Sequence, residues 1–339
     1  MDNIDVVSYS ELYESSHTAF ATKMWPKRIR RRVPEYNRWK FRGPEKGEVE
    51  TLLLAVSGER VVGQLGLVPV NFRVKGKIYK TYWTVDLMVD PDFRRRGIAS
   101  KLYKRAIENC DIAVANGSNE GGSGAMIKLG FEKIKGPKKM LFPIDFRAVL
   151  SFKLSEKYDA LVPFMAILAK PLYFFRSIKL HTTNTKNIRQ VSWKELIEDV
   201  KKFQDELELP HPHHDKDFMH WRCSNFKDFN KEPRAIRTKD GSFAIYTKAS
   251  NSLYVYEWHS VNEKDTTELY AYLLKEAKAF KVATISTVCN FEEDEVFLKK
   301  LGFIPMRKTL STQLFHPPNH EFNHLGKFYY SLYDADENI

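Results

Sequence analysis

A short basic turn is the part of the sequence whose residue types and spacing best suit the binding of an anion. Three arginines, Arg94, Arg95 and Arg96, precede Gly97, and apolar residues at helical spacing begin at Ile98. A glycine that opens a helix lets backbone N–H groups approach a bound group closely. These N–H groups and the helix dipole favour a phosphate, and the guanidinium groups add positive charge. The sequence therefore predicts that this turn binds phosphate groups.

The basic turn is positioned by a predicted strand before it and a predicted helix after it. Apolar residues alternate with others over residues 82–89, and an Asp-Pro-Asp sequence ends this strand. Apolar residues then recur at about 3.6 spacing, so a helix is expected over residues 95–109. The rest of this half is predicted to complete a mixed sheet covered by helices, with strands at 51–56, 61–68, 72–79, 112–115, 131–134 and 139–142 and a helix at 120–129.

Two motifs in this half resemble those of a known enzyme superfamily. The sequence Arg94-x-x-Gly97-x-Ala99 resembles the acyl-CoA-binding motif of the GNAT acyltransferase superfamily. That motif is Gln or Arg, two residues, Gly, one residue, and then Gly or Ala. The superfamily's second motif is an Asn opening a helix that ends in Gly-Phe, and Asn119 lies eleven positions before Gly130 in this sequence. The order and distance of the two motifs support the resemblance, which extends from about residue 50 to residue 143.

The resemblance implies a binding site for acyl-CoA beside the central strand. In the GNAT fold the central strand separates from the next strand, here near Val89. Its free backbone groups then pair with the extended arm of the cofactor, as another strand would. The pyrophosphate would lie on the N–H groups of the basic turn. The cofactor-binding residues implied are Leu87, Met88, Val89, Arg94, Arg95, Arg96, Gly97, Ile98, Ala99, Ser100, Gly117, Asn119, Gly122 and Ser123.

The implied reaction is direct attack of an amine on the thioester, which needs a group that takes a proton from the amine. Asp86 is the nearest candidate, and a strand carboxylate paired with Lys or Arg is the alternative interpretation. The N–H of Val89 is expected to stabilise the oxyanion. Glu257 or His259 of the second half could be a base reaching across a cleft, or a strand residue with partners of its own. Met126 stands where many family members have a Tyr that protonates the leaving thiolate, and a thioether has no proton to give.

The second half repeats the order of elements in the first. Paired strands, a helix and an apolar strand are followed by a helix that ends in Gly302-Phe303. No arginine-rich turn occurs at the corresponding place, so we expect a degenerate domain that serves the acceptor. The predicted fold is α+β (mixed α/β), with two GNAT-like domains, each a mixed, mainly antiparallel twisted sheet flanked by helices. The expected division is 1–148 for the N-terminal GNAT domain binding acyl-CoA, 149–190 for a helical connector and 191–339 for the C-terminal substrate domain.

The connector contains a strongly apolar segment, residues 161–175. It is shorter than the roughly 20 residues that span a bilayer, and Pro163 and Pro171 interrupt it. We expect a helix buried between the two domains. A helix lying on a membrane surface is the alternative, because basic residues flank the segment.

Composition limits the classes of partner. The length of 339 residues fits two domains, and the net charge of +11 favours polyanions such as CoA and a nucleotide-linked substrate. Nucleic acid ranks last, because the basic residues are spread through both halves. The three cysteines and the sequence from His211 to His214 show no metal spacing, so no metal is expected. With neither a signal peptide nor a transmembrane segment predicted, a reducing cytoplasm is the expected location.

These observations together predict an acyl-CoA-dependent N-acyltransferase acting on the amino group of a small acceptor. A tandem architecture of this length resembles bacterial enzymes that acylate amino sugars carried on dTDP or UDP for lipopolysaccharide or capsule synthesis. A nucleotide-linked amino sugar is therefore the expected acceptor, by analogy of architecture. Two alternatives remain open: acyl transfer to a protein, peptide or cell-wall precursor, and a non-catalytic regulatory protein that binds acyl-CoA.

Overall fold

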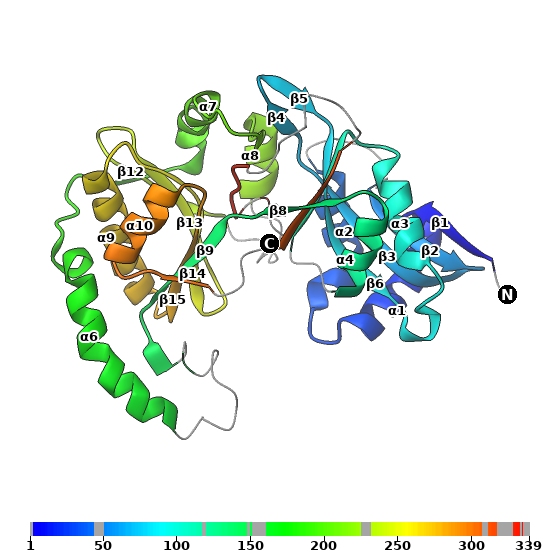
Figure 1. Ribbon diagram of the computed structural model, residues 1–339, viewed down its shortest axis with the longest axis horizontal. Helices are drawn as coiled ribbons and strands as arrows, with labels where there is room; N and C mark the ends of the chain where they lie inside the picture. Colours follow the sequence, from blue (N-terminus) through cyan, green and yellow to red (C-terminus); the bar gives the residue numbers. More distant parts are fainter. Residues whose placement is uncertain are drawn as a thin grey trace.

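The computed structural model describes residues 3–43, 51–116, 120–147, 150, 161–224, 232–306, 311–316, 328–332 and 334. Two sheets of seven strands each, with helices packed on them, lie side by side (Figure 1). The mixed α/β fold class and the presence of two GNAT-like domains are confirmed by this architecture. We call the domain around the first sheet the first domain and the domain around the second sheet the second domain.

The first sheet has one parallel pair of strands, and its other neighbours are antiparallel. Its strands are, in spatial order, β1 (Ile4–Ser8), β2 (Leu52–Ser57), β3 (Arg60–Pro69), β6 (Thr81–Val89), β7 (Ile112–Asn116), β17 (Ser311–Phe315) and β8 (Glu132–Lys135). The parallel pair is β6 with β7. The helical segments of this domain are η1 (Glu11–Tyr13), α1 (Glu14–Met24), η2 (Ile29–Arg32), α2 (Pro34–Arg42), η3 (Pro91–Phe93), α3 (Ile98–Ile107) and α4 (Glu120–Lys128).

The second sheet has the same design, with β14 and β15 as its parallel pair. Its strands are, in spatial order, β10 (Arg189–Val191), β12 (Arg234–Arg237), β13 (Phe243–Ala249), β14 (Ser252–His259), β15 (Thr284–Cys289), β9 (Lys138–Pro143) and β16 (Ile304–Pro305). The helical segments of this half are α6 (Val162–Thr182), η5 (Trp193–Leu196), α7 (Ile197–Asp205), α8 (Lys216–Cys223), α9 (Glu263–Ala279) and α10 (Glu292–Lys300).

The two domains exchange one strand each. β9, which follows the first domain in sequence, pairs with β15 of the second sheet, where Met140 lies opposite Thr287. β17, from the second half, pairs with β7 and β8 of the first sheet, where Leu314 lies opposite Val114. The expectation that residues 139–142 complete the first sheet is therefore wrong, because the open edges of β7 and β15 are each filled by a strand from the other half. The division of the chain at residues 148 and 191 stays a prediction.

The internal repeat is visible where α4 and α10 end. Gly130 has φ +90° and Gly302 has φ +101°, a conformation that glycine adopts without strain. The N–H of Phe131 donates to the carbonyl of Met126 at 3.1 Å, and that of Phe303 donates to Leu298 at 2.9 Å. Both helices thus end in the same hydrogen-bonded cap, which explains the shared Leu-Gly-Phe sequence.

The contact between the domains is apolar and continuous. Trp39 of α2 contacts Trp221 of α8, with ring centroids 6.1 Å apart, and the Trp221 indole N–H donates to the Trp39 carbonyl at 3.0 Å. Trp83 of β6 packs against Phe328 and Tyr330 near the end of the chain. A small third sheet also joins the halves, with β11 (His211–Pro212) pairing with β4 (Phe72–Val74) and β4 with β5 (Lys77–Tyr79).

Helix α6 does not lie between the domains, so the expectation of a buried connector helix is wrong. It runs along the outer edge of the second domain (Figure 1). One face packs on that domain, with Leu180 1% exposed, whereas Phe175 on another face is 71% exposed. The apolar run at residues 161–175 predicted a helix in this region, but the helix extends to Thr182, and the run could not identify which surface packs against it.

Candidate active site

A bulge in β6 opens the first sheet beside the basic turn. Pairing of β3 with β6 shifts register between Gln64 and Gly66, and Asp86 has φ +56° at this place. Beyond the bulge β6 turns away from β7, and the last parallel partners are Thr84 and Ala115. The strands therefore separate after Thr84, earlier than the position near Val89 that we expected.

A cavity of about 780 Å³ occupies the space that this separation leaves. It is bordered by the end of β6, the basic turn, the start of α3 and α4. Ten of the fourteen residues predicted to bind the cofactor line it, together with Phe93, which sequence reasoning missed. The ten are Leu87, Met88, Val89, Arg94, Arg95, Gly97, Ile98, Ala99, Ser100 and Gly122.

The remaining predicted cofactor residues differ in their positions. Arg96 is not a lining residue, because its guanidinium donates to the Asp92 carbonyl at 3.3 Å and lies over the Phe93 ring. Ser123 accepts a hydrogen bond from the Gln313 side chain of β17 and does not line the cavity. Gly117 and Asn119 lie outside the described residues.

The start of α3 is free to receive an anion. Gly97 is the N-cap with φ +74°, and no side chain caps the helix or places a carboxylate in its first turn. A Cβ built on Gly97 would have no atom within 4 Å, so the space above the helix start is open. Orphan N–H groups at a helix start, with guanidinium groups nearby, form an anion-binding site by their chemistry.

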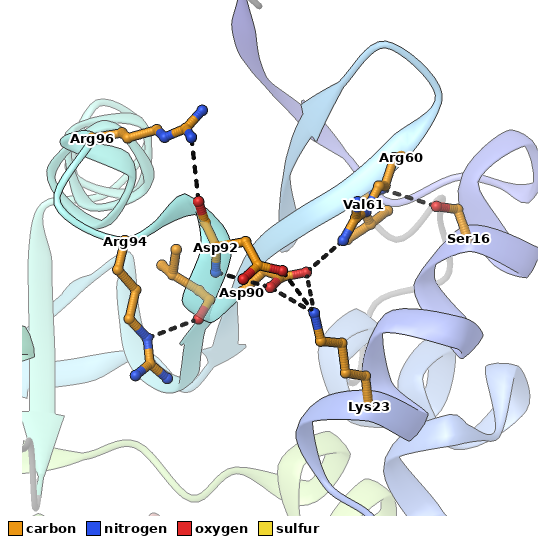
Figure 2. A network of polar contacts seen from close by, with 9 residues as sticks. Ser16, Lys23, Arg60, Val61, Asp90, Asp92, Arg94 and Arg96 are labelled. Atoms are coloured by element: carbon orange, nitrogen blue, oxygen red, sulfur yellow. Dashed lines mark hydrogen bonds and ion pairs between the residues drawn. The ribbon is translucent and has the colours of Figure 1, made fainter.

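An ion-pair network holds the turn that leads into this helix (Figure 2). Asp90 is 1% exposed, and its carboxylate accepts from Lys23 of α1 at 2.8 and 3.0 Å and from Arg60 of β3 at 2.8 Å. Burial alone would raise the pKa of Asp90, but the hydrogen bonds from Lys23, from the N–H of Asp92 and from Arg60 hold it below its usual value. Arg94 donates to the Val89 carbonyl at 3.3 Å, so it too is tied to the strand end.

Asp86 forms ion pairs with two cations. Its carboxylate accepts from Lys40 of α2 at 2.9 Å and also pairs with Arg31 of η2. The Lys40 side chain is almost fully buried, which is unusual for a lysine and is explained by this pair. Sequence reasoning missed Lys40, although its place between Trp39 and Phe41 was a signal that it lies in an aromatic environment. The role of Asp86 as a proton acceptor stays a prediction, and its carboxylate already has two partners.

Two further polar residues support the bulge and were also missed. The Gln64 side chain donates to the backbone carbonyl of Asp86 at 3.4 Å, and its amide oxygen lies 2.8 Å from Nε2 of His17. Burial lowers the pKa of His17, so this imidazole is neutral near pH 7 and can donate to Gln64. Neither residue belongs to a local motif, because their contact joins α1 to β3.

Glu257 and His259, the predicted bases of the second half, do not line the cavity of the first domain. Glu257 is 1% exposed and lies 3.0 Å from Nδ1 of His214, whose Nε2 is 2.8 Å from Asp334. Burial would lower the pKa of His214, but Asp334 and Glu257 together raise it to about 10, so the imidazole is protonated. This Glu257–His214–Asp334 cluster joins β14 to the region of residue 334, a role for His214 that sequence reasoning missed.

His259 lies two residues after Glu257, at the end of β14. Its ring stacks on Phe203 at 4.4 Å, and burial lowers its pKa. It borders a separate cavity of about 290 Å³ in the second domain, with Trp258, Asn290 and Phe291 among the other lining residues. Its role as a base stays a prediction.

Residues 329–332 lie in the space between β14 and β15. These strands pair only as far as Tyr254 and Ser286. Beyond that point, the Asn290 side chain donates to the carbonyl of Tyr330 at 2.9 Å and accepts from its N–H at 2.8 Å. The N–H of Leu332 donates to the Tyr256 carbonyl of β14 at 3.0 Å. In the second domain, therefore, residues 329–332 occupy part of the space between the two strand ends, and only the cavity of about 290 Å³ remains beside them.

Comparison with known proteins agrees with this geometry. Residues 6–115 match the family model described as an acetyltransferase (GNAT) domain. No curated protein gives a significant sequence match. The first domain is therefore a GNAT-type acyltransferase domain.

Solved structures of similar fold extend over both domains. A GCN5-related N-acetyltransferase from Kribbella flavida is 15% identical, with a TM-score of 0.58 over 92% of this chain and 71% of that one. Saccharomyces cerevisiae N-myristoyltransferase with bound myristoyl-CoA is 14% identical, with a TM-score of 0.60 over 93% of this chain and 79% of that one. A putative acetyltransferase from Pyrococcus horikoshii is 11% identical, with a TM-score of 0.57 over 98% and 96% of the two chains. The fold of this chain over both domains is thus similar to the folds of these solved structures.

No group of three or more His, Cys, Asp or Glu side chains within the described part of the chain is arranged to hold a metal ion.

Proposed function

We propose that this protein transfers an acyl group from acyl-CoA to the amino group of a small acceptor. The observation that carries the proposal is the cavity at the start of α3. It combines an uncapped helix N-terminus, exposed arginines and a strand end that has lost its neighbour. Each of these features suits one part of acyl-CoA.

The parts of the cofactor would be bound by different elements. The pyrophosphate would accept from N–H groups at the start of α3, with Arg94 and Arg95 adding charge. The pantetheine arm would lie along Leu87–Val89. Consecutive N–H groups of a strand point to opposite sides, and the N–H of Asp90 donates to Val62 of β3. The N–H of Val89 therefore points to the side that β7 has left, where it can stabilise the tetrahedral oxyanion.

The proton steps depend on solvent or on residues other than Met126. Met126 is fully buried in the apolar cluster that contains Tyr103 and Phe131. A thiolate with a pKa near 8.5, taking cysteine as a guide, is a tolerable leaving group near neutral pH. The attacking amine must lose a proton to water or to Asp86, and the ion pairs with Lys40 and Arg31 make water the simpler acceptor.

For the acceptor, we propose a nucleotide-linked amino sugar of the dTDP or UDP type. The support is the basic run of η2, from Arg28 to Arg32, which contacts the bulge through the Arg31–Asp86 pair. Arg30 of the same run lies within electrostatic range of Tyr256 in the second domain. A diphosphate held there would present its sugar near the bulge in β6. Such substrates and acyl-CoA are both made in the cytoplasm, which is where we place the reaction.

A second candidate is a long-chain donor used on a protein or peptide amine. It is favoured by the similarity in fold to N-myristoyltransferase with bound myristoyl-CoA. The cavity of about 780 Å³ has the size of a site for a large ligand, which leaves the chain length of the donor open.

Calorimetric titration with acetyl-CoA and myristoyl-CoA, followed by thiol release, tests the proposal. The acceptor panel contains dTDP- and UDP-linked amino sugars and peptides with a free amino terminus. Binding with thiol release on one nucleotide sugar is the expected result. Release only with a peptide would select the second candidate, and binding without release on any acceptor would indicate a regulatory protein. Absence of binding would contradict the cofactor site itself.

A further inference from the structure

Helix α6 carries a stripe of large apolar side chains that faces solvent. The stripe consists of Phe164, Ile167, Leu168, Phe174, Phe175 and Ile178, whose spacing of 3, 1, 6, 1 and 3 residues puts them on one side of a helix. Their exposed fractions range from 43% for Ile178 to 71% for Phe175. Pro171, which is also exposed, lies in the middle of the same stripe. This is a continuous apolar surface along a helix of 21 residues.

The opposite face of α6 is the one that holds the helix on the second domain. Val162, Ala166, Ser177 and Leu180 are buried there. Tyr173 on the same face donates to the carbonyl of Gly302 and packs against Phe142. Because the buried face already explains how α6 is attached, the apolar stripe needs a different explanation.

The charged side chains of α6 itself are all basic. Residues 162–182 contain no Asp or Glu. On one border, the His181 ring packs against Phe174 and its Nδ1 lies 3.1 Å from the Lys278 ammonium group. On the other border, Lys179 lies over the Phe297 ring, and Arg176 donates to the carbonyl of Lys299 at 3.2 Å. An apolar stripe between two basic borders is complementary to a surface in which apolar groups lie beneath a layer of negatively charged groups.

We propose that α6 docks this protein on the surface of an anionic lipid bilayer, with the helix axis parallel to the membrane plane. The apolar side chains would enter the boundary between headgroups and acyl chains, and the basic borders would contact anionic headgroups. None of the helices in the described ranges is long and apolar enough to cross a membrane, so the contact is with one leaflet. Figure 1 shows α6 on the outer edge of the second domain, away from α3 and α4 of the first domain, so docking leaves the cavity bordered by those two helices accessible.

A second copy of this chain suits the stripe less well than a membrane does. Two α6 helices packed through their stripes would bring Arg176 and Lys179 close to the basic border of the partner helix, with no acidic residue on either helix to pair with them. Like charges beside an apolar seam disfavour that pairing. Pro171 would also lie in the centre of the seam, where it limits close contact.

Sedimentation of the full chain with vesicles tests the proposal. The vesicles are phosphatidylcholine alone and phosphatidylcholine mixed with phosphatidylglycerol. We expect binding to both, at least tenfold tighter to the anionic vesicles at low salt. The triple variant Phe164→Ser, Ile167→Ser, Phe175→Ser should lose at least tenfold in affinity for either vesicle. Acyl-CoA binding and the circular dichroism spectrum report whether this variant is folded.

A matched control makes the same change at exposed apolar residues elsewhere. Leu12, Ile78 and Val261 are 80%, 54% and 51% exposed, and their triple serine variant should bind vesicles as the wild type does. The variant Lys179→Glu distinguishes binding of α6 to a membrane from pairing of two α6 helices. It should weaken binding to anionic vesicles, whereas it would strengthen a pairing of two α6 helices. Failure of the wild type to bind vesicles, equal binding by the stripe variant, or a dimer in light scattering that only the stripe variant dissociates would each overturn the proposal.

Discussion

The helices that follow the two central strands, α3 after β6 and α9 after β14, begin in opposite ways. The first N–H groups of α3 have no side-chain cap, and Gly97 leaves the space above them open. In α9 the Asn262 side chain accepts from the N–H of Asp265 at 2.9 Å, and Glu263 and Asp265 place carboxylates in the first turn. The first N–H groups of the helix are thus available to an external anion in the first domain, whereas in the second domain they are capped by the protein's own side chains.

The space beside the central strand is also more open in the first domain than in the second. Beside β6 there is a cavity of about 780 Å³. Beside β14 lie residues 329–332, held through Asn290 and the Glu257–His214–Asp334 cluster, and they leave a cavity of only about 290 Å³. The strand separation is therefore present in both halves, but it leaves a large cavity in the first and is partly filled by residues 329–332 in the second. A GNAT-like strand separation alone does not identify a cofactor site. The state of the helix start and the contents of the gap must also be known.

The largest effect is expected from His214→Gln, which removes the cation between two buried carboxylates. We expect a loss of about 3–5 kcal/mol in the free energy of unfolding, because Glu257 and Asp334 are left without it. The pKa of His214 is raised from 6.5 to about 10 in the folded protein. The stabilisation is therefore complete below about pH 6.5 and is lost as pH rises towards 10. Urea unfolding of both proteins from pH 6 to pH 10 should show a shrinking difference, and a constant difference would contradict the ion-pair cluster.

Gly97→Asp tests the open helix start of the first domain. A carboxylate there would repel the pyrophosphate, and we expect acyl-CoA affinity to fall at least about hundredfold, or roughly 2.8 kcal/mol. Gly76→Asp is the matched control, since Gly76 also has a positive φ and open space but lies in the β4–β5 hairpin. Calorimetry on both variants separates the cost of the backbone conformation from the loss of binding. Equal affinity in the two variants would move the cofactor site elsewhere.

Met126→Ala tests whether the first domain works without a general acid at this position. The side chain is fully buried, so the free energy of unfolding should fall by about 2 kcal/mol. The kcat of the folded protein should stay within a few fold. Met140, fully buried in the second domain, gives the control for core truncation. A kcat that drops hundredfold in Met126→Ala alone would show that this residue takes part in the reaction.

Asn262→Ala should have the smallest effect of the four. Loss of the cap should cost about 1 kcal/mol of stability in thermal or urea unfolding. The stoichiometry of acyl-CoA binding should remain one per chain, because residues 329–332 still lie beside β14 and leave a cavity of only about 290 Å³. Binding of two acyl-CoA molecules per chain, by the wild type or by Asn262→Ala, would contradict the inference that only the start of α3 binds the cofactor.

Local patterns predicted much of this molecule. The strand, turn and helix around Gly97 follow from periodicities within about 25 residues, and the shared Leu-Gly-Phe ends revealed the repeat. The exchange of β9 and β17 could not be predicted, because strand partners far apart in sequence leave no local signal. Pairing of Asp86 with a Lys or Arg was one of the two interpretations of the sequence, but Lys40 and Arg31 could not be identified as the partners, because the contact joins a strand to two helical segments. The apolar segment of α6 was visible, but its exposure depends on packing that periodicity does not determine.

The exchange of β9 and β17 also governs the order in which the chain can fold during synthesis. The edge of β7 stays open until residues 311–315 have been made, so the first sheet is complete only after both halves have been synthesised. Until then an unpaired strand edge is available to other chains, which is a risk for aggregation. Contacts between such distant parts of the chain also slow folding. We therefore expect the two halves to mature together, and a ribosome-bound chain that stops before residue 311 to depend on chaperones.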